Sequence, residues 1–348
     1  PPVTFFTYYP EGYASPTIDE FVPLVNANAF AVSYTVIARY EVGERDQVIA
    51  TGTIGANARG GITVTSRAEP GAAVVREGVP YAIEVQSTGQ LGATMSHYDF
   101  GVTAGESFTE RTSRTWTFAE ANKNTVTNRD FLVFYNPNST NANLTVTITY
   151  DDGAVVSFAQ PVEAFRRGGI NFEEDTRITR QGRFSIRVDA DVNIVAAVTS
   201  FDLINTRGGA FLGNPDGGSI ESVIPRLTNG GGTDSSISLY NANSTGTSVT
   251  VTGTYYRADL PNLVRTITMG ANQRQSFTLA ELGVLSGQPI GLRFVANLPV
   301  TVNSVEFRNG DGNMPTTPTQ AFRTGVIGDA FVNPAYAGIT YIEELAIY

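Results

Sequence analysis

Residues 130–153 read DFLVFYNPNSTNANLTVTITYDDG, and this stretch decides the fold of the chain. An apolar run, 131–135, stops at Asn136-Pro137-Asn138, where the proline fixes its own φ and has no N–H to give to a sheet. Between residues 144 and 150, apolar residues alternate with threonine, which is the two-residue period of a strand with one apolar face. Asp151-Asp152-Gly153 then supplies a hairpin turn. The stretch predicts a strand, a break, a second strand and a turn.

This pattern recurs along the chain. Residues 20–36 (EFVPLVNANAFAVSYTV) and 235–255 (SSISLYNANSTGTSVTVTGTY) are two further copies, and residues 343–348 (EELAIY) match the opening of a fourth. The last residue before the break falls at positions 25, 135, 240 and 348, at intervals of 110, 105 and 108 residues. Intervals the size of a domain indicate tandem modules, and not a solenoid of short repeats.

We therefore expect an all-β chain of tandem immunoglobulin-like β-sandwich modules, with about seven short strands in each. The chain has no cysteine, so the Cys–Trp–Cys pin of antibody domains is excluded. The segments between modules read as short strands and ordered loops, which predicts stiff connections and a rod. The expected divisions are 1–112 for the first module, 113–207 for the second, 208–320 for the third, and 321–348 for the opening strand of a further module or an inter-subunit donor strand.

Composition excludes several classes of partner. The formal charge is −10, from 33 acidic and 23 basic residues, and this disfavours nucleic acid and anionic membrane surfaces as partners. No apolar run approaches the length of a membrane-spanning helix, so no membrane span is expected. Charged residues are only 16% of the chain, which predicts a surface of mostly uncharged polar residues. Because the chain begins with Pro1, we expect a processed form or a portion of a longer protein.

The module openings resemble a bacterial extracellular repeat family. Tyr9-Pro10-Glu11-Gly12-Tyr13, Asp19-Glu20-Phe21 and Asn26-Ala27-Asn28 are similar to the aromatic, Glu-Gly-Tyr, acidic-pair and Asn-Pro-Asn elements that open each Ig-like module of that family. The likeness covers all three modules, although the expected entry of the third, Phe211-Leu212-Gly213-Asn214, lacks Glu-Gly-Tyr. The resemblance implies an extracellular, cell-surface location and a non-catalytic role.

The sequence offers no catalytic set, so we expect no enzyme and no cofactor. His97 is the single histidine, and neither a triad nor a hydrolytic zinc site is built from one histidine, so we expect it on a strand surface. Carboxylates cluster in three places, but neighbours on a strand point to opposite faces, so we expect solvated turns there. These clusters are Asp151-Asp152, Glu173-Glu174-Asp175 and Glu343-Glu344.

Two kinds of incidental site remain open. Asp189, Asp191 and Asn193 have the alternating oxygen spacing of a calcium loop, but Ile194 stands where an EF-hand needs glycine. Turns use the same residues for local hydrogen bonds, and we expect that role and no metal. Three Asn-x-Ser/Thr sequons are possible glycosylation sites, in or just after the break: Asn138, Asn143 and Asn243.

The last segment, ITYIEELAIY over residues 339–348, reads as an opening strand with no module after it. An unpaired apolar strand promotes aggregation, so we expect it either to begin a further module or to add to a sheet of a neighbouring subunit. A contact of the second kind that does not close gives a filament. The residues expected to form this inter-subunit strand are Ile339, Tyr341, Ile342, Leu345, Ile347 and Tyr348.

The sequence thus predicts a structural subunit of an extracellular filament, sheath or surface layer, with self as the partner in a head-to-tail homopolymer. The alternative is an adhesin or carbohydrate-binding stalk, with surface glycans as partners and a tip domain elsewhere. Sugar binding needs exposed aromatic side chains, for which the candidates are Tyr8, Tyr9, Tyr13, Tyr255 and Tyr256. A third possibility is the accessory stalk of a secreted enzyme.

Overall fold

The computed structural model describes residues 3, 5–230, 233–243, 246–257 and 260–308. These residues form strands and connecting loops with no helix, so the all-β prediction is confirmed. Accordingly, no helix long and apolar enough to span a membrane is found among the described residues. The inter-subunit strand expected over 339–348 lies outside the described residues.

The first unit comprises residues 5–112 and contains two sheets. One sheet has the strand order β1-β7-β3-β4, and the other has β10-β9-β2-β5-β6 with β8 beside β2. Their cores meet in one apolar cluster that includes Val22, Leu24, Val36 and Val85. The strands are β1 (Phe5–Tyr9), β2 (Glu20–Asn26), β3 (Val32–Tyr40), β4 (Asp46–Ile54), β5 (Ala58–Thr65), β6 (Ala73–Val74), β7 (Tyr81–Ser87), β8 (Gly92–Ala93), β9 (Ser96–Asp99) and β10 (Val102–Ala104).

The second unit is organised around one long strand, β16 (Gly182–Asp202). Its first half pairs with β13 and β11, and its second half pairs with β12 and β17, so this strand belongs to both layers of the sandwich. The other strands are β11 (Ser113–Lys123), β12 (Asn128–Tyr135), β13 (Ala142–Tyr150), β14 (Val155–Val162), β15 (Arg167–Asn171), β17 (Arg207–Leu212) and β18 (Asn214–Pro215).

The third unit repeats this plan with β24 (Pro289–Arg308) as the long strand. Its first half pairs with β19 and β21, and its second half with β20. The remaining strands are β19 (Ser219–Thr228), β20 (Thr233–Asn241), β21 (Val249–Arg257), β22 (Leu263–Met269) and β23 (Gln273–Thr278). The three units share the sheet orders β4-β3-β7-β1, β14-β13-β16-β11 and β22-β21-β24-β19, as tandem copies should.

The sheet pairing moves one expected boundary. Strand β17 pairs with β16 and β18 pairs with β11, so residues 207–215 complete the second unit. A division between residues 207 and 208 is therefore wrong, and the third unit begins with β19. The expected third entry, Phe211-Leu212-Gly213-Asn214, is part of the second unit for the same reason. The true entry is the segment of β19 that contains Ile224.

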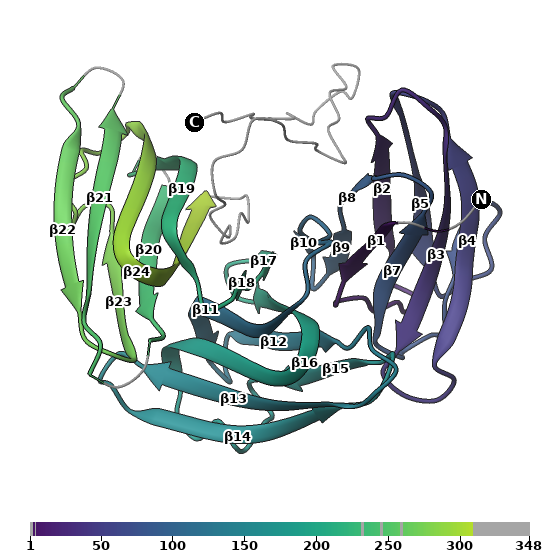
Figure 1. Cartoon of the computed structure of the whole chain (residues 1–348), viewed down its shortest axis with the longest axis horizontal. Helices are drawn as coiled ribbons and strands as arrows, with labels where there is room; N and C mark the ends of the chain where they lie inside the picture. The colour runs from purple at the N-terminus through teal and green to yellow at the C-terminus, as the bar shows by residue number, and fades with distance from the viewer. Residues whose placement is uncertain (1–2, 4, 231–232, 244–245, 258–259, 309–348) are drawn as a thin grey trace.

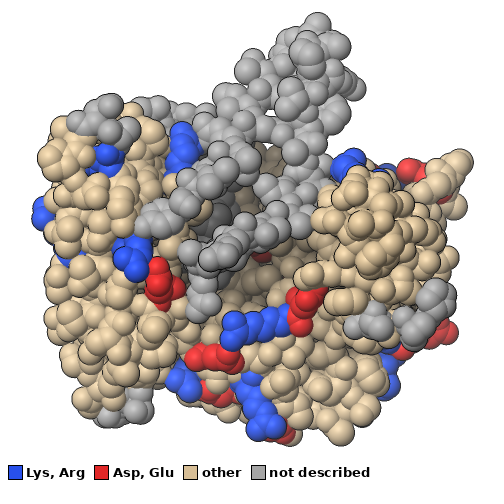
Figure 2. Space-filling model, turned by 45° about the horizontal axis from the view of Figure 1, so that its top comes forward, with Lys and Arg blue, Asp and Glu red and all other residues tan. Residues whose placement is uncertain are grey.

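The units do not form a straight rod. Figure 1 shows a U, in which the second unit is the base and the first and third units are the arms. Uncharged residues cover most of the face seen in Figure 2, and charged side chains gather there in small groups of both signs. The contacts that set this shape lie at the two junctions between units.

Candidate functional site at the junctions between units

The asparagine at each break is a buried structural clamp. Asn136 is fully buried, and its Nδ2 donates to the carbonyl oxygens of Thr140, Val162 and Glu163 at 2.8, 3.2 and 3.1 Å. Asn26 and Asn241 are also fully buried and donate to three carbonyls each. These bonds satisfy carbonyls where strands end, which explains the need for an amide at this position.

The second asparagine of each motif completes the clamp. Asn138 Nδ2 donates to Asn136 Oδ1 at 2.7 Å and to the carbonyl of Asn193 at 2.7 Å. Asn243 Nδ2 makes the equivalent bonds to Asn241 and Pro299. A glycan on Asn138 or Asn243 would have to replace these bonds, so the structure disfavours both as acceptors. Asn143 is exposed, and its glycosylation stays a prediction.

The expected calcium candidates have protein partners. Arg187 forms an ion pair with Asp189, with Nε 2.7 Å from Oδ2. Asp191 accepts hydrogen bonds from the N–H and the Nδ2 of Asn143, at 2.9 and 2.7 Å. No cluster of three or more metal-binding acidic, histidine or cysteine side chains occurs within the described part of the chain. The expected turn is wrong, because residues 189–193 lie inside strand β16. The side chains of Asp189 and Asp191 contact Arg187 on the same strand and Asn143 on β13.

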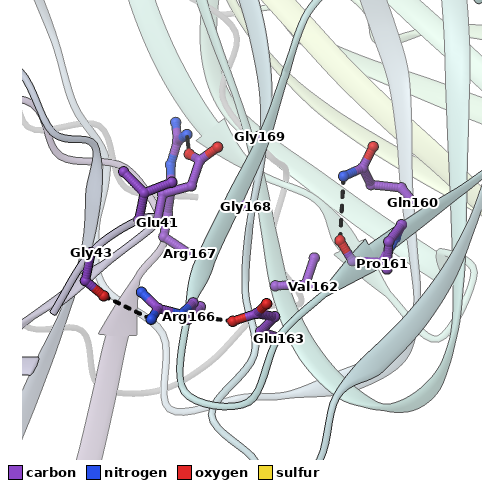
Figure 3. A pocket seen from close by; sticks show the side chains of 11 residues that line it. Glu41, Gly43, Gln160, Pro161, Val162, Glu163, Arg166, Arg167, Gly168 and Gly169 are labelled. Carbon is purple, nitrogen blue, oxygen red and sulfur yellow. Dashed lines mark hydrogen bonds and ion pairs between the residues drawn. The ribbon is translucent and has the colours of Figure 1, made fainter. Parts of the chain in front are cut away.

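An arginine between two acids joins the first unit to the second. The side chain of Arg167 is buried on β15, and its Nη2 lies 3.1 Å from Glu11 Oε2 of the first unit. Its Nη1 forms an ion pair with Glu41, which follows β3 of the first unit. Beside it, Arg166 donates to the carbonyls of Tyr40 and Gly43 at 3.2 and 2.8 Å. Figure 3 shows these arginines in a cavity of about 400 Å³ between the two units.

The same arrangement joins the second unit to the third. Arg274 on β23 is buried, and its Nη2 lies 2.5 Å from Glu120 Oε2 on β11. Its Nη1 forms an ion pair with Asp151, and its Nε donates to the carbonyl of Ala119 at 3.0 Å. Asp151 and its neighbour Asp152 therefore have different partners, because Asp152 pairs with Arg180 at the surface. We call each set of one arginine and two acids a junction clamp.

Register shows that the two clamps are copies of one design. Tyr9 pairs with Ile83 of β7 as Phe118 pairs with Ile186 of β16, so Tyr9 and Phe118 hold equivalent positions. The clamp glutamates, Glu11 and Glu120, lie two residues after them. Each clamp arginine pairs with the tyrosine before the break, Tyr135 or Tyr240. Two residues before each arginine the backbone is left-handed, at Phe165 and Asn272, with φ of 55° and 51°.

Apolar and aromatic contacts make each junction continuous with a core. At the first junction, Ala82 of the first unit lies in the core of the second, and Phe201 of the second unit lies in the core of the first. Tyr8 and Tyr135 meet across the boundary with ring centroids 5.6 Å apart, and the Tyr135 hydroxyl hydrogen-bonds to Glu84. This packing supports the predicted stiff connection between these two units.

His97 is not on a strand surface as expected. It is 3% exposed, and its Nδ1 lies 2.7 Å from Glu20 Oε1. Glu20 also accepts a hydrogen bond from the Tyr81 hydroxyl at 2.5 Å. A cavity of about 420 Å³ at the first junction is lined by His97, Asp99, Glu11 and Arg167, among others. The sequence could not reveal this site, because Glu20 and His97 are 77 residues apart.

The charge state of His97 predicts a pH dependence of stability. Burial lowers its pKa, but the nearby carboxylates of Asp99, Glu20 and Glu11 outweigh burial and raise the pKa of His97 to about 10 from 6.5. The folded chain thus holds this proton more tightly than the unfolded chain. The resulting stability is complete below pH 6.5 and is lost as pH rises through about 10.

We therefore expect the free energy of unfolding of the first unit to fall between pH 6.5 and about 10. The measurement is urea unfolding followed by circular dichroism across this range, for the chain and for His97→Gln. The variant should be less stable at low pH and should lose the part of the slope due to His97. An identical slope in both proteins would show that this histidine is not held protonated.

One carboxylate cluster is less solvated than expected. Glu173 is half-buried, and its Oε2 accepts a hydrogen bond from the backbone N–H of Asp130 at 2.8 Å. Burial raises the pKa of Glu173, and it raises the pKa of buried Asp130 well above the usual range. Asp175 instead pairs with Arg177, which lowers its pKa. These groups serve local backbone and ion-pair contacts around the start of β12.

Comparisons with known proteins give no family for this chain. No protein-family model matches it, and no curated protein matches it. Among solved structures, the chain is similar to the crystal structure of Thermotoga maritima 1070, with 17% sequence identity and a TM-score of 0.27. That match covers 31% of this chain and 97% of the other.

Proposed function

We propose that this chain is a non-catalytic structural subunit of an extracellular filament, sheath or surface layer, assembled head to tail. The observation that supports this role most strongly is that one junction clamp is used twice, at both joints between the described units. A catalytic constellation would be expected once, at one site. A contact repeated at every joint suits a scaffold whose task is to fix the orientation of its parts.

The chemistry of the clamp favours orientation over net stability. A buried ion pair offsets its desolvation only with good geometry and further hydrogen bonds, and its clearest benefit is a defined register. Each clamp arginine reaches two acids of the preceding unit, one on or just after the entry strand and one directly after β3 or β13. Such a fork is satisfied in one relative orientation of the units.

The aromatic residues considered for sugar binding give less support to the adhesin alternative. Tyr9 and Tyr255 are buried in the cores of the first and third units. Tyr8 packs on Tyr135 at the first junction. These three side chains therefore have packing roles, and they do not form an open aromatic face.

Negative-stain imaging with light scattering tests the proposal. We expect ordered polymers from the chain that ends at Tyr348, and monomers from one that ends before Ala337, because the shorter chain lacks the expected donor strand. Binding to a glycan array by a monomeric chain would support the adhesin stalk instead. Hydrolytic activity that maps to a carboxylate of this chain would contradict the non-catalytic role.

A further inference from the structure

The two junction clamps differ at one atom of the arginine. Arg274 uses its Nε as well as both Nη atoms, because Nε donates to the carbonyl of Ala119 at 3.0 Å. Arg167 is only 7% exposed, and its buried Nε has no hydrogen-bond partner among the residues that the structure describes. A buried charged donor is costly to leave unpaired. The Nε of Arg167 therefore marks a place where a ligand atom can accept a hydrogen bond.

Arg167 lines the cavity of about 420 Å³ at the first junction, which we call the junction cavity. Both units contribute to its wall, with Asp99 from the first and Phe201 from the second. Phe100 and Glu174 also line the cavity, and both side chains are exposed, so the cavity opens to solvent. Its volume falls within the range of roughly 300–1,000 Å³ that is typical of small-molecule sites.

Most of the charge in the wall is balanced, which favours a neutral ligand. Glu11 and Glu41 form ion pairs with Arg167. Asp99 Oδ2 lies 3.8 Å from Nε2 of His97, which is held protonated. The wall thus combines a buried N–H donor with carboxylate acceptors. A hydroxyl group fits both, because it accepts a hydrogen bond through its oxygen and donates one through its hydrogen.

Aromatic rings supply the apolar part of the wall. Phe100 is 46% exposed, and its ring contacts that of Phe201 edge to face, with centroids 5.1 Å apart. Tyr13, which was considered for sugar binding from the sequence, also lines the cavity. A ligand with an apolar face can pack on these rings while its hydroxyl groups bind the charged side chains.

We propose that the junction cavity binds a neutral sugar residue. Arg167 Nε donates to one of its oxygen atoms, and the carboxylates of Asp99 and Glu174 accept from its hydroxyl groups. Its apolar face packs on the rings of Phe100 and Phe201. This site goes beyond the proposed function and does not rest on it, because a scaffold can assemble with or without a bound sugar.

Ligand-observed NMR and calorimetric titration of the whole chain test this site. The neutral probes are the methyl glycosides of glucose, galactose, mannose and N-acetylglucosamine, and the charged probes are glucuronate and protonated glucosamine. We expect a neutral probe to bind at one site per chain, because Nε of Arg274 at the second junction already has a partner. The charged probes should bind at least about 5-fold more weakly, because each meets a like charge in the wall. Absence of binding by every neutral probe, or tighter binding of a charged one, would overturn the proposal.

Two substitutions of exposed wall residues locate the bound sugar. Phe100→Ala removes a ring and Glu174→Ala removes an acceptor, and each should weaken binding at least about 5-fold. Phe30→Ala is the matched control and should bind as the native chain does, because Phe30 is 55% exposed in the same unit and does not line the cavity. Circular dichroism confirms that each variant is folded. Equal binding by Phe100→Ala and Phe30→Ala would contradict the site. Polymer formation is measured separately, so the sugar site and the scaffold can fail independently.

Discussion

Replacing Arg167 with alanine is expected to lower the free energy of unfolding by about 3–5 kcal/mol, because it leaves a buried acid without its partner. The side chain of Glu11 is 10% exposed, and burial already raises its pKa while Arg167 opposes that rise. Trp116 is the single tryptophan and is buried in the second unit, so its fluorescence reports the unfolding of that unit in urea. We expect this transition to have its midpoint at a lower urea concentration in Arg167→Ala than in the native chain.

Arg180→Ala is the matched control in the same unit. Arg180 pairs with Asp152 at the surface, where both side chains are about half exposed, so its loss should cost less than about 1 kcal/mol. Adding Glu11→Gln to Arg167→Ala should recover part of the loss, because the buried charge is then removed. Equal effects of Arg167→Ala and Arg180→Ala would contradict a buried clamp.

Asn136→Ala should be similarly severe, at about 3–5 kcal/mol, because it leaves several buried backbone groups without partners. Asn136 donates to three carbonyls, and its Oδ1 accepts from the N–H and Nδ2 of Asn138. The same tryptophan-monitored unfolding measures the effect. Asn136→Asp should also be destabilising, because a carboxylate cannot donate to these carbonyls.

Asn143→Ala is the control for the asparagine clamp. Asn143 is exposed, and its side chain donates a hydrogen bond to Asp191, so we expect a loss below about 1 kcal/mol. A loss for Asn136→Ala as small as that for Asn143→Ala would show that the break tolerates any small residue. The interpretation of the repeated asparagine as a structural clamp would then be wrong.

Local sequence patterns predicted the fold well because a strand and its turn are specified by neighbouring residues. The alternation over residues 144–150 and the turn at Asp151-Asp152-Gly153 correspond to β13 and the hairpin that follows it. The break at Asn136 was predicted from Pro137 and its spacing. The role of Asn136 as a clamp could not be predicted, because the carbonyls of Val162 and Glu163 lie 26 and 27 residues away in sequence.

The junction clamps could not be predicted from local sequence patterns, because their members are also far apart in sequence. Glu11 and Arg167 are 156 residues apart, and Glu120 and Arg274 are 154 residues apart. One signal was present: Arg59, Arg167 and Arg274 are 108 and 107 residues apart, which is the repeat interval. The prediction of a rod was wrong because the relative orientation of the units depends on these distant contacts, which strand patterns do not encode.

Small-angle X-ray scattering of the whole chain tests the central claim, that the junction clamps hold Ig-like units as a rigid scaffold. We expect the native chain to scatter as one U-shaped particle. The double variant Arg167→Ala/Arg274→Ala should have a larger radius of gyration at conditions where circular dichroism shows its units still folded. A native profile typical of freely jointed units, or an unchanged profile in the folded double variant, would contradict the claim.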